Sequence, residues 1–183
     1  MESKDTVLYA ALVKFYKEPA HLRALTDAIK GGSISLRIID WFVTNYAKRT
    51  NVVYPLTTPH GETRSFNVYM QYKSMLKGFS KRLFDPFSRR TRIIFQDADG
   101  VDMETTIGQL NFFKWAISCK VLEYTLQHAK EIEKDMLQCI KSRHEDAEGA
   151  IATTTNKTKR RELSRAAIKT LTQTKVILTL KFS

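Results

Sequence analysis

The sequence predicts a mainly α (α+β) fold, a helical bundle-like domain with one or two short β-hairpins. Apolar residues recur at helical spacing over most of the first 144 residues. That pattern is interrupted twice by short β-branched and aromatic runs beside turn residues. The 183 residues, 43% of them hydrophobic, are enough for one domain with its own core. We therefore expect a globular domain over residues 1–144, followed by a polar linker and basic C-terminal tail over residues 145–183.

Three helices are predicted before the first strand. Apolar residues between positions 7 and 16 lie on one helical face, and Pro19 ends that helix and begins the next. The second helix stops at Gly31, because glycine accepts the left-handed conformation of a helix C-cap. Ser33 or Ser35 then caps the third helix. It is the most apolar of the chain, and we expect it at the centre of the core.

Two hairpins are predicted from changes in residue pattern. Residues 52–54 have strand character, residues 55–63 contain two prolines and a glycine and are interpreted as a loop, and residues 66–68 supply a return strand. Residues 92–95 form a second strand candidate. Residues 101–104 can pair back on it across an Asp- and Gly-containing turn.

Two further helical stretches follow these hairpins. Apolar spacing returns over residues 69–79, and Pro86 closes that segment. Thr105 or Thr106 caps a long helical region that continues to about residue 143, with an interruption expected at residues 118–120.

Positive charge is concentrated in two segments. Residues 77–92, here called the basic connector, hold six basic residues and one acid, a net charge of +5. Residues 157–183, the basic tail, hold eight basic residues and one acid, a net charge of +7. Because the whole chain carries +11, the remainder is close to neutral. Such segregation is typical of a protein that binds a polyanion.

We predict that both segments contact nucleic-acid phosphates, with DNA favoured over RNA. Phe79, Phe84 and Phe87 are interleaved with the cations of the basic connector, and we expect these rings in the core, where they would hold the cations in place. The predicted contacts in the connector are Lys77, Lys81, Arg82, Arg89, Arg90 and Arg92. Those in the tail are Lys157, Lys159, Arg160, Arg161 and Arg165.

The residue patterns give no support for an enzyme, a metal site or a cofactor. No nucleotide-binding glycine motif, nucleophile motif or metal-ligand spacing occurs, so we expect no small-molecule substrate. Asp40 stands in the most apolar helix, and we interpret it as a helix-surface residue or the ion-pair partner of Arg37. Cys119 and Cys139 suit a reducing compartment, and no apolar run has the length of a membrane span.

The middle of the chain resembles a group of small proteins encoded by nucleocytoplasmic large DNA viruses, of the iridovirus, marseillevirus and phycodnavirus kind. This resemblance spans residues 36–124 and leaves out the basic tail. It implies a viral protein located in the virion or in the viral factory of the host cytoplasm, with the host nucleus as the alternative. The resemblance indicates a viral setting but does not indicate a mechanism. The segments that carry it are residues 36–48, 51–54, 66–69, 84–87, 89–90 and 106–117.

Three functions stay open at this level. The first is a non-enzymatic viral protein that associates with nucleic acid largely without sequence preference, in genome packaging or organisation. The second is a minor capsid or scaffold protein that contacts only other virion proteins or a membrane. Its anchors would be exposed aromatic residues, namely Tyr69, Tyr72, Phe112 and Trp115. The third is a viral transcription or replication accessory factor.

Overall fold

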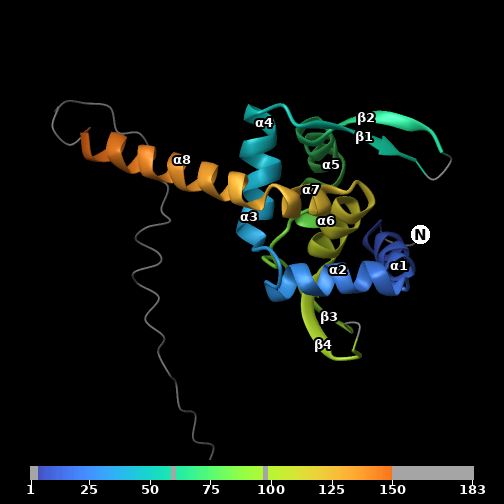
Figure 1. Ribbon diagram of the computed structural model, residues 1–183. Helices are drawn as coiled ribbons and strands as arrows, with labels where there is room; N and C mark the ends of the chain where they lie inside the picture. Colours follow the sequence, from blue (N-terminus) through green and yellow to red (C-terminus); the bar gives the residue numbers. More distant parts are fainter. Residues whose placement is uncertain (1–3, 59–60, 97–98, 150–183) are drawn as a thin grey trace, which may run out of the picture. The chain divides into compact units, whose positions relative to one another are not determined.

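The computed structural model describes residues 4–58, 61–96 and 99–149, and it confirms the mainly helical class with two antiparallel two-stranded sheets. One compact unit ends at Arg143. Of the remaining residues, only the end of the last helix is described. Figure 1 shows the two hairpins on different sides of the helices of this unit.

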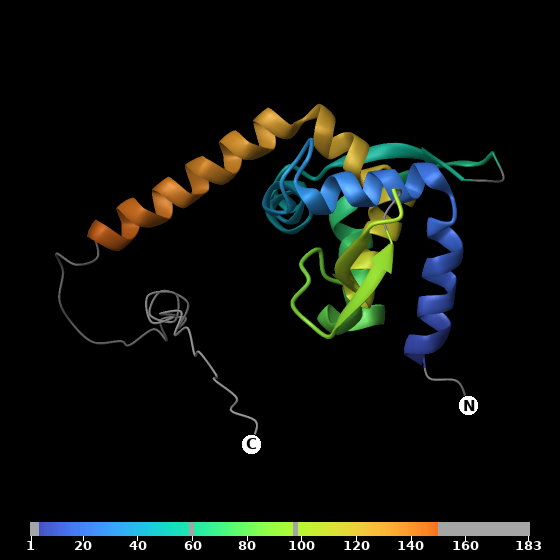
Figure 2. The same ribbon diagram turned by 90° about the horizontal axis from the view of Figure 1, so that it is seen from below.

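The first two helices follow the predicted boundaries. Helix α1 (Lys4–Tyr16) is followed by α2 (Pro19–Lys30), which has its proline in the first turn. Gly31 is left-handed, with φ of 70°, and its N–H donates to the carbonyl of Asp27, as a glycine C-cap requires. Figure 2 shows α1 and α2 meeting at a sharp corner.

The third predicted helix contains a π-helical turn that the apolar pattern did not reveal. It consists of α3 (Leu36–Trp41), the π segment η1 (Phe42–Tyr46) and α4 (Ala47–Arg49). The backbone N–H of Ile38 donates to the Ser35 side chain, which caps the start. Within the π segment the Thr44 hydroxyl donates to the carbonyl of Asp40 at 2.6 Å, and such a side-chain bond competes with the regular helical ladder.

The first hairpin is longer than predicted. Strand β1 (Val53–Thr57) pairs antiparallel with β2 (Thr63–Asn67), and Tyr54 lies opposite Phe66. The prediction that Pro55 begins a loop is wrong. A two-stranded sheet consists of two edges, and a proline is tolerated on an edge strand because its missing N–H need not complete a ladder.

The second hairpin is confirmed, and the helix before it is kinked. Helix α5 (Val68–Leu83) is capped by Asn67 and has a left-handed residue, Ser80, near its end. Strand β3 (Arg92–Gln96) pairs antiparallel with β4 (Asp102–Thr106), as the sequence predicts.

Helix α6 (Ile107–Ser118), capped by Thr106, takes the central place that the sequence assigned to residues 35–48. It packs against α1, α2 and α5, and also against α7 (Val121–Gln127). The break before α7 is confirmed, whereas a second break, at His128 before α8 (Ala129–Gly149), was not predicted. Because neighbours surround α6, most of its residues are buried around the whole circumference.

The buried position of α6 corrects the predicted aromatic interface. Tyr72 is 7% exposed, Phe112 is fully buried and Trp115 is 6% exposed, so the prediction of these three as exposed anchors is wrong. Tyr69 is half-buried. Phe84 lies at the centre of this group, with ring centroids 6.0 Å from Tyr72, 5.3 Å from Phe112 and 5.5 Å from Trp115. These aromatic side chains form part of the core.

Candidate nucleic-acid interface

The backbone of the basic connector is held by the first turns of α6. The Asn111 side-chain amide donates to the carbonyl of Leu83 at 2.8 Å, and the Gln109 amide donates to the carbonyl of Pro86 at 2.8 Å. The backbone N–H of Asp85 donates to the carbonyl of Gly108 at 3.2 Å. Three bonds thus attach the segment between α5 and β3 to a helix that is itself buried.

The Gln109 side chain makes a further hydrogen bond. The Thr105 hydroxyl donates to the Gln109 side-chain oxygen at 2.9 Å, and both side chains are almost fully buried. Buried polar networks define one geometry when their members are satisfied. Sequence reasoning missed Gln109 and Asn111. The available signal was a pair of amides among apolar residues in the first turns of a helix, shortly after its capping threonine.

The aromatic residues of the connector lie at different depths. Phe84 is buried, while Phe79 and Phe87 are half-buried and pack at the edge of the protein. The guanidinium of Arg89 lies 4.8 Å from the centroid of the Phe87 ring. Of the three rings predicted in the core, Phe84 lies in it and Phe79 packs against it, whereas Phe87 lies outside it and contacts the Arg89 guanidinium.

Three of the six predicted cations of the connector are engaged in ion pairs. Arg82 makes two hydrogen bonds to Asp5, at 2.7 and 2.9 Å. Arg89 makes two to the buried carboxylate of Asp85, at 2.9 and 2.7 Å. Arg92 pairs with Glu104 of the facing strand at 2.7 Å. Much of the positive charge of these three arginines is therefore neutralised within the protein.

The other three cations of the connector are exposed. Within the described part of the chain, Lys77, Lys81 and Arg90 form no ion pair, and we call them the free cations. The predicted contacts in the tail all lie outside the described residues, namely Lys157, Lys159, Arg160, Arg161 and Arg165.

Asp40 is half-buried and faces the basic connector. Of the two interpretations offered by the sequence, a helix-surface position or an ion pair with Arg37, the ion pair is not found among the described residues. Burial raises the pKa of the Asp40 carboxyl above its ordinary value. The nearby Arg89 lowers this pKa, Asp85 raises it and Lys81 lowers it. Long-range packing therefore brings Asp40 into the electrostatic environment of the connector.

We expect Asp40 to make the protein less stable as the pH rises. The folded state holds the Asp40 proton more tightly than the unfolded state, so the free energy of unfolding falls as the pH passes from the ordinary carboxyl pKa through the raised one. Asp40→Asn should remove this fall and stabilise the protein at neutral pH, with no gain at a pH below both values. Urea denaturation across a pH series measures it.

The exposed carboxylate of Asp102 provides the control for this experiment. Asp102→Asn makes the same change of charge on β4, and it should alter stability little at any pH. An equal gain for Asp40→Asn at acid and neutral pH would mean that ionisation of Asp40 is not the cause.

A second basic surface adjoins the connector and was not predicted. The ammonium groups of Lys48, from α4, and Lys73, from α5, each lie 5.8 Å from the centroid of the Tyr69 ring. Lys77 follows Lys73 by one helical turn on the same face of α5. Lys48 and Lys73 therefore extend the exposed positive surface that begins at Lys77. Sequence reasoning missed it because Lys48 and α5 come together only in the folded chain.

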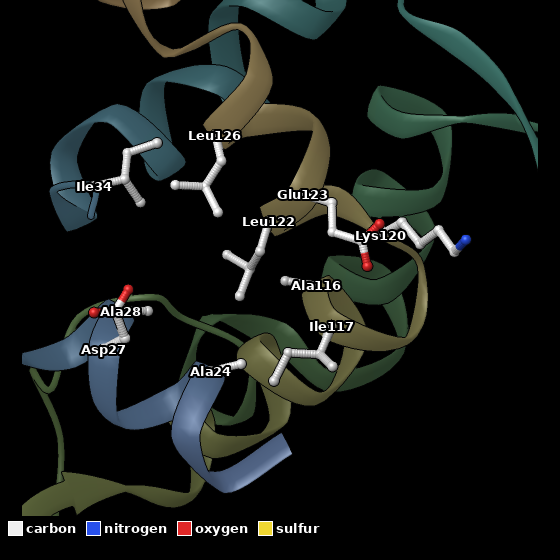
Figure 3. A pocket seen from close by; sticks show the side chains of 10 residues that line it. All are labelled: Ala24, Asp27, Ala28, Ile34, Ala116, Ile117, Lys120, Leu122, Glu123 and Leu126. Atoms are coloured by element: carbon white, nitrogen blue, oxygen red, sulfur yellow. The ribbon is translucent and has the colours of Figure 1, made fainter. Parts of the chain in front are cut away.

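Two of the cavities formed by the described residues differ in chemistry. One, of about 380 Å³, includes Arg82 and Arg90 in its wall. The other is an apolar crevice of about 150 Å³ between α2, α6 and α7, drawn in Figure 3, where Ile117 and Leu122 lie among alanine side chains. Asp27, Lys120 and Glu123 are its charged residues. With two carboxylates beside one lysine, this crevice has the wrong charge for a polyanion.

No three His, Cys, Asp or Glu side chains gather as metal ligands in the part of the chain that the structure describes. No helix within the same residues combines the length and the apolar character needed to cross a membrane.

These features define a mainly helical protein with two hairpins and a braced basic connector. The model of the Family of unknown function (DUF7197) matches residues 1–177, so the chain belongs to this family. It is 38% identical over 137 residues to "Uncharacterized protein L507" of Acanthamoeba polyphaga mimivirus, covering 72% of this chain and 52% of that protein. The chain thus spans about half the length of this curated relative. No solved structure matches.

The relative confirms the resemblance stated from the sequence. Mimivirus is a nucleocytoplasmic large DNA virus, and viral origin is therefore supported for this chain.

Proposed function

We propose that this protein is a non-enzymatic viral protein that associates with nucleic acid through phosphate contacts, largely without sequence preference. The observation that carries the proposal is the presence of three free cations, Lys77, Lys81 and Arg90, on or beside a backbone segment that α6 braces. Because the segment is held in place, little backbone conformational entropy is lost when these cations meet the phosphates of a nucleic acid.

The expected binding is electrostatic. A cation that neutralises a phosphate releases counterions, so affinity falls as salt increases. Phosphate contacts fix the position of a protein on the nucleic acid, but they do not distinguish one base from another. The five cations predicted in the tail would add contacts of the same kind. DNA is favoured over RNA because the setting is a DNA virus. The proposed role is genome packaging or organisation in the virion or viral factory, with the host nucleus as the alternative.

The test is the salt dependence of binding to a labelled DNA duplex, measured by fluorescence anisotropy on the full chain. Replacing Lys77, Lys81 and Arg90 together by alanine should weaken binding and flatten the plot of log affinity against log salt. If each cation meets one phosphate, the slope should change by about 2 to 3 units. A second full-length variant has the five tail cations replaced by alanine. Its loss of affinity and its change in salt slope measure how much the tail contributes to binding.

A matched control replaces three exposed lysines elsewhere, Lys17, Lys130 and Lys134, by alanine. It changes the net charge equally and should leave the slope close to that of the unchanged protein. Equal slopes for the connector variant and the unchanged protein would remove the free cations from the interface. Failure of the unchanged protein to bind DNA even at low salt would favour the alternative of a capsid or scaffold protein with protein or membrane contacts only.

A further inference from the structure

The larger cavity lies where four parts of the chain meet. It has a volume of about 380 Å³ and is bounded by α1, the basic connector, the second hairpin and the start of α6. Two arginines, Arg82 and Arg90, and two threonines, Thr91 and Thr106, are among the residues that line it. A concave surface with two guanidinium groups suits a phosphate, because guanidinium matches phosphate oxygens with two parallel hydrogen bonds.

The Arg82 guanidinium in this cavity is already paired with a carboxylate of the protein. The two oxygens of the Asp5 carboxylate accept from the two terminal nitrogens of Arg82, at 2.7 and 2.9 Å. Asp5 and Arg82 also both line the cavity. This fork-to-fork geometry is the one that a phosphate would adopt on the same guanidinium. Arg90, in the same wall, has no ion-pair partner among the described residues.

The Asp5 pair is suited to exchange with a ligand. The Arg82 side chain is 61% exposed and that of Asp5 is 32% exposed, so water and salt reach the pair. An exposed ion pair contributes little to stability and is weakened by screening. A backbone phosphodiester carries the same single charge as a carboxylate and is flanked by further phosphates, so it can replace Asp5 at little cost to the fold.

We propose that this cavity binds a phosphate group between Arg82 and Arg90, and that Asp5 is an internal competitor which must release Arg82 first. This inference rests on the proposed function for the source of the phosphate, a nucleic-acid backbone. A free phosphate ion has the same chemistry and is distinguished by a separate arm of the test. Asp5 thus limits the affinity of the protein for its polyanion.

The experiment compares Asp5→Asn with Glu62→Gln in the full chain. Both variants remove one negative charge, but Glu62 pairs with Arg64 on the first hairpin, outside the cavity. Asp5→Asn should bind the labelled duplex about 2- to 5-fold more tightly, the effect that one exposed charge pair supports. Its salt slope should be steeper by up to about one unit, because the Asp5 carboxylate that the unchanged protein releases from Arg82 takes up a cation from solution and offsets part of the counterion release from the DNA. Glu62→Gln should change neither quantity by a comparable amount.

Two further measurements separate the outcomes. Adding Arg82→Ala to Asp5→Asn should abolish the gain in affinity, and thermal unfolding of each variant checks that the fold is retained. Equal effects of Asp5→Asn and Glu62→Gln on affinity and slope would overturn the cavity site while leaving the proposed function intact.

Inorganic phosphate addresses the case in which no form binds DNA. A rise in melting temperature with phosphate for Asp5→Asn, absent for the variant that also carries Arg82→Ala, would support the anion site and reject nucleic acid as its source. No such rise, in a protein that does not bind DNA, would overturn both proposals.

Discussion

Replacing Phe84 by alanine is expected to lower the free energy of unfolding by about 3 to 5 kcal/mol, the range for removing a fully buried phenylalanine. Phe84 is 1% exposed and lies within 6.0 Å, between ring centroids, of Tyr72, Phe112 and Trp115. Truncation would leave a cavity between α5 and α6, because the surrounding rings can collapse only partly. Urea denaturation of the variant and of the unchanged protein measures the loss.

The control for Phe84 is an apolar side chain that the fold leaves in water. Met70 on α5 is 61% exposed, so Met70→Ala should alter the free energy of unfolding by no more than about 0.5 kcal/mol. A loss for Phe84→Ala as small as that for Met70→Ala would contradict the packing described between α5 and α6.

Gly108→Ala should be destabilising by about 1 to 3 kcal/mol, the range for overpacking a filled core. A β-carbon at Gly108 would lie 2.9 Å from the carbonyl oxygen of Arg82 and 3.4 Å from backbone atoms of Leu83 and Phe84. These neighbours are main-chain atoms and cannot rotate away. The added methyl group must therefore separate α6 from the connector and strain the bond from Asp85 to the Gly108 carbonyl. Chemical denaturation again provides the measurement.

Gly78 offers a matched control for Gly108. It lies in helix α5, and a β-carbon there would meet no heavy atom within 4 Å. Gly78→Ala should therefore stabilise the protein by about 0.5 to 1 kcal/mol, through the higher helix propensity of alanine. If Gly108→Ala also stabilised the protein, the close contact between α6 and the connector would be wrong.

Most element boundaries could be predicted because their causes are local. Pro19 and Gly31 bound α2 through their own backbone preferences, and Thr106 caps α6 with its own side chain. The predictions of local structure failed where a residue preference has exceptions that depend on the tertiary structure around the residue. Pro55 lies inside β1 because that strand is an edge, and the π-helical turn at residues 42–46 leaves no clear mark in the apolar spacing.

The candidate site could be predicted only in part. Charge counts located the basic connector, but they could not tell which of its cations pair within the protein. Asp5, the partner of Arg82, lies 77 residues away in the chain, and Glu104 reaches Arg92 only across the second hairpin. The role of Gln109 could not be predicted for the same reason, because the Pro86 carbonyl to which it donates is 23 residues away in the chain. Each of these pairings depends on how separate elements pack.

For this protein, the amino-acid sequence was sufficient for the helical class, both hairpins and the position of the excess charge. These properties follow from the spacing of apolar residues, from caps and from composition, which act over a few residues. The packed fold determined that Tyr72, Phe112 and Trp115 are buried, and that Lys77, Lys81 and Arg90 are the exposed cations of the connector that make no ion pair with any residue the structure describes. Burial and ion pairing require contacts between distant segments, and those contacts form only when α6 is enclosed by its neighbours.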